Sequence, residues 1–234
     1  MSVHDPAFHE EIVNDDYAQR DDLHRLFGRI LPKTITNGLG VEEDPLAYIV
    51  RHTQLLPRHV LATFNAILSR NFHATGTFRR VEEQAIRDGV AHVQRIIATQ
   101  ILDRYERIYP KLITMCREVL PDLNPICGYN ELRKIEGRFR NRIEDDVVAL
   151  WDTLFQVGVI GRVAGDGALR DTTEQLPERY CYGNFHFNMD AAFGMATDGS
   201  YCFHPVFSRA FGIVRRTADK RVVYPANVDM VTLS

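Results

Sequence analysis

The stretch DPLAYIVRHTQLLPRHVLATFNAIL, residues 44–68, decides how the N-terminal part of the chain folds. It opens with Asp44 and Pro45, which suit the N-cap and the first turn of a helix. Pro57 precedes a second run of apolar residues at helical spacing, a position where proline removes no helical hydrogen bond. The stretch therefore predicts two helices joined by a turn, and the second helix has an apolar stripe of Val60, Leu61, Phe64, Ile67 and Leu68.

Helical spacing continues on both sides of this stretch. Residues 15–31 have the pattern of an amphipathic helix, and the glycines of TNGLG then mark a loop. From Val81 to about Leu120 the pattern is helical for nearly the whole distance, with Pro110 as a kink or a division. We expect a flexible N-terminus at 1–14, a helical bundle at 15–78 and a long connector helix at 79–120.

The character of the chain changes after the turn-rich string PDLNPICGYN, residues 121–130. Two helical segments are followed by the β-like string VGVIGRV and by the aromatic alternation RYCYGNFHFN. Two helices followed by a hairpin is the order of a winged helix, although a small α+β cap would look the same. We predict a mainly α fold with a winged-helix (α+β) module at 121–212. Residues 213–234 form a tail in which RVVYP adds an edge strand or stays irregular.

Composition excludes several classes of function. The 28 basic and 31 acidic residues give a net charge of −3, so the chain as a whole has no basic field to attract nucleic acid. The N-terminus is acidic and polar, unlike a signal peptide, and no apolar run approaches the ~18 residues of a membrane span. We therefore expect a cytoplasmic protein without a membrane partner.

The sequence contains none of the common catalytic motifs, since GxxxxGK[ST], the dinucleotide fingerprint, GxSxG and HExxH are all missing. The four cysteines form no CxxC pair and read as reduced, buried thiols. A cluster of Cys181, His186, Cys202 and His204 is the least favoured alternative, because its spacing fits no common metal site. We predict no catalytic residue and no metal site.

The residues of the opening stretch carry a resemblance to a known family. A helix ending in Arg51 and Thr53, followed by Pro57 and Arg58 and then by Asn65, resembles the lid of bacterial P-loop ATPases of the AAA+ and STAND type. Further similarity lies in the string Gly158 to Gly161 and in the string FHPVF, which resemble the C-terminal winged helix of those ATPases. The similarity covers about residues 15–212 and lacks the Walker A and Walker B core.

The resemblance implies a regulatory role rather than catalysis by this chain. Arg58 would be the sensor-2 group that reaches the γ-phosphate, with Arg51 as a second nucleotide-sensing candidate. The chain alone would bind no cofactor; ATP and Mg²⁺ would come with an ATPase core joined in cis or in trans. A homo-oligomer is also compatible. The alternative for Arg51 is a bridge between helix ends or an ion pair with Asp44, and for Thr53 a helix cap.

A second hypothesis is a stand-alone winged-helix protein that binds DNA or regulates transcription. It depends on the basic run RKIEGRFRNR, which supplies five cations that could contact phosphates: Arg133, Lys134, Arg138, Arg140 and Arg142. The alternative is a solvated helix face, favoured by the interspersed acids of the same region.

Overall fold

The computed structural model describes residues 26–76, 80–139, 150–164, 180–186, 193–213 and 221–225. Its helices are α3 (Pro45–Arg51), α4 (Pro57–Thr75), α5 (Glu83–Asp103), α6 (Leu112–Val119), α7 (Tyr129–Phe139), α8 (Leu150–Gln156) and α9 (Pro205–Ser208), with a 3-10 turn at Leu120–Asp122. Its strands are β1 (Ile35–Thr36), β2 (Glu42–Glu43), β3 (Ile126–Gly128), β4 (Ile160–Val163), β5 (Tyr180–Asn184), β6 (Ser200–Phe203) and β7 (Val222–Pro225). Among these described helices, none is long and apolar enough to cross a membrane.

The two helices predicted from residues 44–68 are confirmed. The Asp44 carboxylate accepts a hydrogen bond from the Ala47 amide at 2.7 Å, which caps α3, and Pro45 stands in the first turn. Helix α4 likewise begins at Pro57; it ends at Thr75 and is capped by Gly76, whose φ of 72° is the left-handed conformation that glycine adopts at helix ends.

Helix α4 packs along α5, and the two backbones approach closely at one point. A Cβ added at Gly89 of α5 would lie 2.8 Å from the Ile67 Cα of α4. The buried residues of α4 are His59, Thr63, Ile67 and Asn71, at a spacing of four. The predicted apolar stripe is therefore wrong in part: Leu61 is 64% exposed, and three of the four buried side chains are polar.

The connector predicted at 79–120 consists of two helices in the structure. Helix α5 ends at Asp103, turns follow, and α6 begins after Lys111, which has a φ of 70°. Pro110 lies in this break, in agreement with the division expected there.

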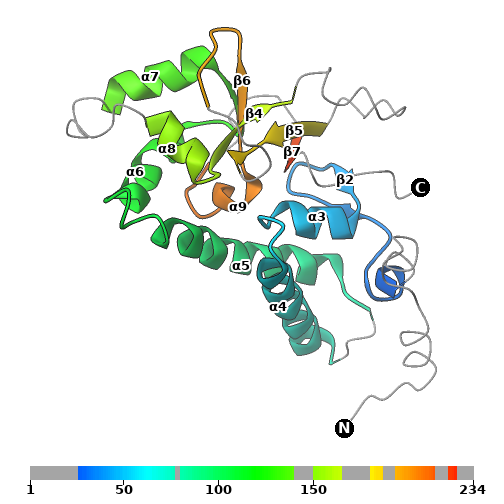
Figure 1. Ribbon diagram of the computed structural model, residues 1–234. Coiled ribbons are helices and arrows are strands. Elements are labelled where there is room, and N and C mark those ends of the chain that lie inside the picture. Colours follow the sequence, from blue (N-terminus) through cyan, green and yellow to red (C-terminus); the bar gives the residue numbers. More distant parts are fainter. Residues whose placement is uncertain are drawn as a thin grey trace.

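The C-terminal part of the chain is built on one mixed sheet (Figure 1). The strand order is β3-β6-β4-β5-β7, with every pair antiparallel except β5 and β7, which are parallel. Helices α6, α7 and α8 lie near one end of this sheet, while α3, α4 and α5 lie across the molecule from α7 (Figure 1). A separate two-stranded sheet pairs β1 with β2.

The expected fold class, mainly α with a winged-helix module, is wrong. Of the residues that the structure describes, 54% are helical, and their helices combine with a curled five-stranded sheet, so the fold is α+β. The reason lies at the sheet's two edges: residues 126–128 look like part of a linker but form β3 against β6, and residues 222–225 form β7 against β5. A winged-helix hairpin has neither of these outer strands.

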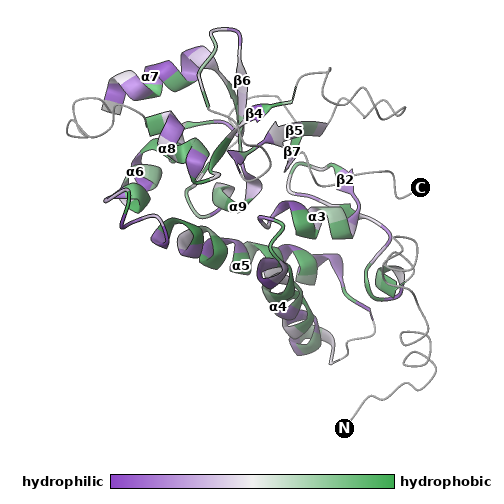
Figure 2. Ribbon diagram, viewed as in Figure 1, coloured by the Kyte–Doolittle hydropathy of each residue, from purple (hydrophilic) through white to green (hydrophobic). Residues whose placement is uncertain are grey.

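The C-terminal strand also joins the N-terminal helices to the sheet. Val222 and Tyr224 of β7 are buried with Val41 and Ala47 from the region around β2 and α3. The largest core cluster extends from α5 through α6 and α8 to the sheet and α9. Green apolar and purple polar residues alternate along α5 and α8, whereas α7 is mostly purple (Figure 2).

Candidate functional site

Arg51, at the end of α3, lies in a buried network centred on Glu43 of β2. Its Nε donates to one Glu43 carboxylate oxygen at 2.8 Å and its Nη2 donates to the other at 3.0 Å. The same carboxylate accepts hydrogen bonds from the Asn37 amide and from the Tyr224 hydroxyl of β7. The Arg51 guanidinium also lies 4.9 Å from the ring centre of Tyr48 and 5.4 Å from that of Tyr224.

This geometry gives Arg51 a structural role. Burial is the largest single effect on the pKa of Arg51 and lowers it, but Glu43, Tyr224 and Tyr48 together raise it by more, so the guanidinium stays charged. The guanidinium donates from Nε and Nη2 to Glu43 inside the protein, and Arg51 is 8% exposed. Of the alternatives weighed for Arg51, an internal ion pair describes it, with Glu43 rather than Asp44 as the partner.

The turn between α3 and α4 is held by local hydrogen bonds. The Thr53 hydroxyl donates to the Val50 carbonyl at 2.8 Å and accepts from the Leu55 amide at 3.2 Å. The His52 Nδ1 lies 2.7 Å from the Tyr48 carbonyl, and Leu55 has a φ of 56°. Thr53 thus closes the end of α3, as its structural alternative proposed.

Arg58, unlike the buried and paired Arg51, is accessible to a ligand. It is exposed, in the first turn of the 19-residue helix α4. That turn has no side-chain cap and no acidic residue, so the partial positive charge of the helix N-terminus is not offset locally. Within the described ranges no carboxylate forms an ion pair with Arg58.

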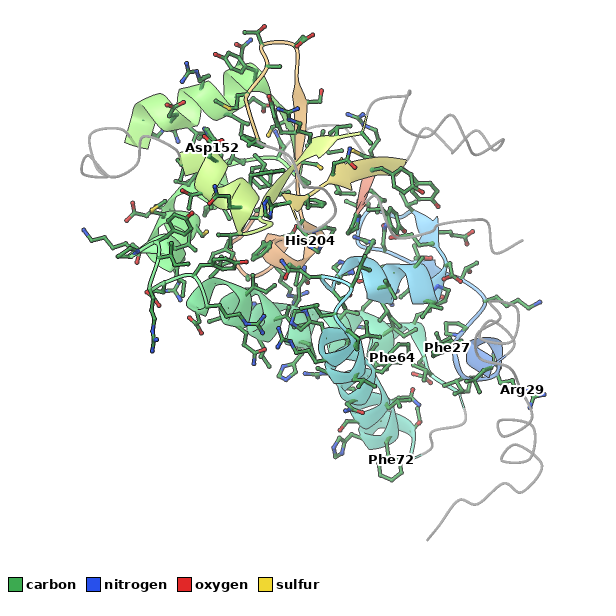
Figure 3. All side chains as sticks on the ribbon, in the orientation of Figure 1. Phe27, Arg29, Phe64, Phe72, Asp152 and His204 are labelled. Atoms are coloured by element: carbon green, nitrogen blue, oxygen red, sulfur yellow. The ribbon has the colours of Figure 1, made fainter. Side chains whose placement is uncertain are left out.

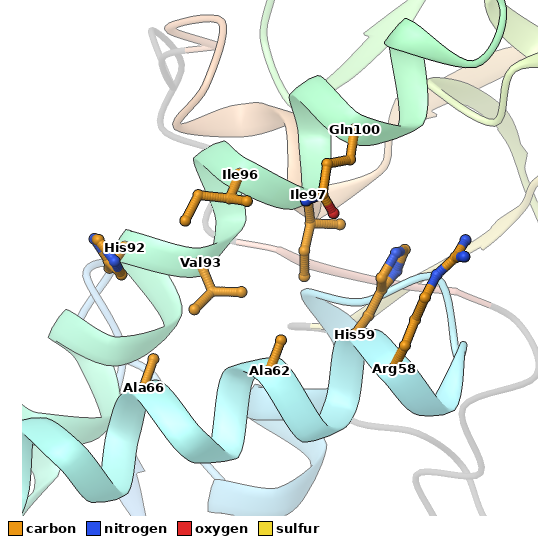
Figure 4. A pocket seen from close by; sticks show the side chains of 9 residues that line it. All are labelled: Arg58, His59, Ala62, Ala66, His92, Val93, Ile96, Ile97 and Gln100. Carbon is orange, nitrogen blue, oxygen red and sulfur yellow. The ribbon is translucent and has the colours of Figure 1, made fainter.

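A groove between α4 and α5 opens beside Arg58 (Figure 4). Its volume is about 360 Å³, and it is lined by Arg58, His59, Ala62 and Ala66 from α4 and by His92, Val93, Ile96, Ile97 and Gln100 from α5. Arg58, His59 and Gln100 lie at one end, and the side chains along the middle are apolar (Figure 4).

His59 was not among the residues singled out from the sequence. It is 2% exposed, and neither ring nitrogen has a hydrogen-bond partner among the described residues. Burial, followed by the charges of Arg58 and Arg104, lowers the pKa of His59 to about 4, so the ring is neutral at pH 7. The signal that could have found it is its position four residues before Thr63 and eight before Ile67, on the buried face of α4.

His204 is buried like His52 and His59 and lies near the centre of the molecule (Figure 3). Its Nδ1 accepts a hydrogen bond from the Val206 amide at 3.2 Å and caps α9. Burial, with the charges of His59 and Arg51, lowers its pKa to about 3. The sequence had placed His204 in a possible metal cluster; in the described part of the chain no group of His, Cys, Asp and Glu could hold a metal ion.

The other members of that cluster are also accounted for. His186 is exposed, and its ring contacts Phe155 edge-on at 5.6 Å between centres. The four cysteines are free and buried, which confirms the prediction of buried thiols. Burial raises the pKa of the Cys116 thiol to about 12, so this group is a poor nucleophile.

The basic run proposed for nucleic acid falls partly outside the described residues, since Arg140 and Arg142 are not among them. Arg133 donates to the Glu136 carboxylate at 2.7 Å and to the Tyr129 hydroxyl at 3.0 Å. Lys134 and Arg138 are exposed on α7, beside these paired groups. The described part of α7 therefore presents cations interspersed with acids.

No protein-family model matches the chain, and neither a curated protein nor a solved structure is significantly similar to it.

Proposed function

We propose that this chain is a regulatory portion of a P-loop ATPase, in which Arg58 contacts the phosphates of a nucleotide held by a separate core in cis or in trans. The observation that carries the proposal is the exposed Arg58 guanidinium, which has no ion pair among the described residues, at a helix N-terminus without a side-chain cap. Amides and an arginine at a helix N-terminus are suited to binding phosphate. In this proposal the core holds ATP and Mg²⁺ tightly and places the protein in the cytoplasm, whereas the chain alone contacts nucleotide phosphates only weakly, through Arg58.

The proposal gives different tasks to the two arginines of the opening stretch. Arg58 alone senses the nucleotide, because the Arg51 guanidinium is occupied by Glu43. Arg51 instead holds the end of α3, from which a short turn leads to Arg58. No DNA contact is assigned to residues 121–212, because the five-stranded sheet replaces the winged helix and Arg133 is already paired with Glu136.

Titration of the whole chain with nucleotides, followed by NMR of the arginine side chains, tests the sensor role. We expect weak, saturable binding in the order ATP, ADP, AMP, with the largest shift at the Arg58 guanidinium. A hydrogen bond to a charged group contributes about 1.5–3 kcal/mol, and exposure reduces that here, so Arg58→Ala should weaken ATP binding about five- to thirtyfold.

Arg70→Ala is the matched control, because Arg70 is also exposed on α4 but lies twelve residues further along the helix. ATP affinity should be unchanged in this variant. Equal affinity for ATP and AMP, or no Arg58-dependent binding tighter than about 10 mM, would contradict the proposal.

A further inference from the structure

The groove between α4 and α5 has the composition of a site for a small amphipathic anion. We infer that it binds a medium-chain carboxylate, with the carboxylate at Arg58, His59 and Gln100 and the alkyl chain along Ala62, Val93 and Ile97. Such a ligand needs no ATPase core, so its binding and nucleotide sensing can each hold or fail alone.

The polar end of the groove consists of donors without a matching acid. Arg58 carries five N–H groups, a Gln100 amide carries two, and a neutral imidazole carries one. None of the nine lining residues is acidic. An anionic head group therefore finds attraction here and no like charge in the lining.

His59 is the observation that points to a ligand rather than to a solvated surface. A buried polar group without a hydrogen bond costs about 1–3 kcal/mol. His59 is 2% exposed, lines the groove, and has no hydrogen-bond partner at either ring nitrogen among the described residues. A carboxylate oxygen that accepts from the protonated ring nitrogen would remove part of this cost, since the second nitrogen is an acceptor and stays unpaired.

The rest of the groove favours an alkyl chain. Beyond Arg58, His59 and Gln100 the lining consists of alanine, valine and isoleucine side chains, with His92 at the far end, and Ile96 is 45% exposed although it is large and apolar (Figure 4). From Arg58 to Ala66 the groove follows eight residues of α4, or about 12 Å at 1.5 Å per residue. That length suits a medium chain rather than acetate.

The size of the groove identifies the ligand as a small molecule and not as a protein segment. Its volume of about 360 Å³ is at the lower end of ligand pockets, which hold ~300–1,000 Å³. A stable protein partner would cover about 800 Å² on this side, far beyond nine residues.

Calorimetric titration of the full chain with octanoate tests the assignment. We expect saturable binding at millimolar or lower concentration, with at least tenfold weaker binding of octanol, butyrate and inorganic phosphate. Arg58→Gln should weaken octanoate binding about tenfold, while Arg70→Gln should leave it within twofold. Ala66→Phe should abolish binding by filling the groove, and Ala62→Leu, at an exposed position, serves the same purpose if the first variant does not fold.

Octanol binding as well as octanoate, phosphate displacing octanoate at equal concentration, or Arg58→Gln binding normally would each overturn the assignment. So would the absence of octanoate binding up to about 10 mM. Ala66→Phe retains Arg58, so an ATP titration of this variant shows whether nucleotide binding persists when the groove is filled. Loss of octanoate binding with unchanged ATP binding there is the expected result.

Discussion

Replacing Arg51 by alanine is the most informative perturbation of the fold. The substitution removes both hydrogen bonds to Glu43 and leaves a carboxylate whose side chain is 0% exposed without its counter-ion. The Asn37 amide and the Tyr224 hydroxyl still donate to it, but neither carries a charge. The cost is therefore that of a buried, unpaired charge rather than that of a lost surface contact.

Breaking a buried ion pair by removing one partner costs about 3–5 kcal/mol. The substitution also removes the contacts of the guanidinium with the rings of Tyr48 and Tyr224, and this loss is included in that range. We therefore expect Arg51→Ala to lower the free energy of unfolding by about 4 kcal/mol. Domains are stable by only about 5–15 kcal/mol, so much of the stability should disappear. If the free energy of unfolding falls by about 2 kcal/mol per molar urea, the urea concentration at the midpoint of unfolding should decrease by about 2 M.

Urea unfolding followed by circular dichroism provides the measurement. Arg87→Ala is the matched control, because Arg87 forms a partly exposed ion pair with Glu83 at 2.9 Å and its loss should cost less than about 1 kcal/mol. Glu43→Gln combined with Arg51→Met should be less destabilised than the sum of the single variants by about 2 kcal/mol. A loss below about 1 kcal/mol for Arg51→Ala, or additive single variants, would refute a buried ion pair at this position.

Three further predictions concern the buried histidines, one glycine and the thiols. The pKa values of His59 and His204 are lowered to about 4 and 3 from the ordinary 6.5, so stability is complete above pH 6.5 and falls as the unfolded chain takes up protons. Each histidine should lower the free energy of unfolding by roughly 1.4 kcal/mol per pH unit between pH 6.5 and its folded pKa. In urea unfolding of His59→Leu and of His204→Asn, the free energy of unfolding should therefore depend less steeply on pH between 6.5 and 4 than in the wild type. Gly89→Ala should lower the melting temperature, because the added Cβ would clash with the α4 backbone. Gly137→Ala is the control: its added Cβ would have no atom within 4 Å, so the higher helix propensity of alanine should raise the melting temperature. A higher melting temperature for Gly89→Ala would contradict the close contact between α4 and α5. The four buried cysteines should react with a disulfide reagent only after unfolding, and rapid reaction of the native protein would show that a thiol is accessible.

Local signals in the sequence predicted the helices of the N-terminal part well. Asp44 and Pro45 act within one helical turn, and so does Pro57, so their effect needs no distant partner. The exposed Leu61 shows the limit of the same reasoning. A prediction from hydrophobicity alone assigned the wrong residues to the buried face of α4, because His59, Thr63 and Asn71 are polar and yet buried.

Strands were expected at VGVIGRV and RYCYGNFHFN, where β4 and β5 lie, but the order of the strands in the sheet was beyond reach because their pairing is not local. Strand β3 has three residues and pairs with β6 more than seventy residues later, with Ile126 opposite Cys202. Strand β7 pairs in parallel with β5, with Tyr180 opposite Val222. The three residues of β3 carry too little alternation to predict a strand. The string RVVYP was expected to add an edge strand or to stay irregular, and β7 is an edge strand, but its four buried residues show no alternation from which its neighbour could be predicted.

The two arginines of the opening stretch show why the candidate site could be predicted only in part. Both are forked cations seven residues apart, and nothing between them distinguishes a sensor from a structural residue. The difference comes from Tyr224, which lies 181 residues after Glu43 and completes the network that buries Arg51.

That network has a consequence for Arg58. A side chain can contact a ligand selectively only if its backbone is held in place. The Glu43–Arg51 pair fixes the end of α3, the Thr53 hydroxyl fixes the turn, and Pro57 then begins α4 with Arg58 in its first turn. Because Tyr224 donates to Glu43, the C-terminal strand of the sheet supports the same arrangement from the far end of the chain. The buried arginine is therefore a positioning residue for the exposed one, and damage to the network should weaken anion binding at Arg58 before it unfolds the protein.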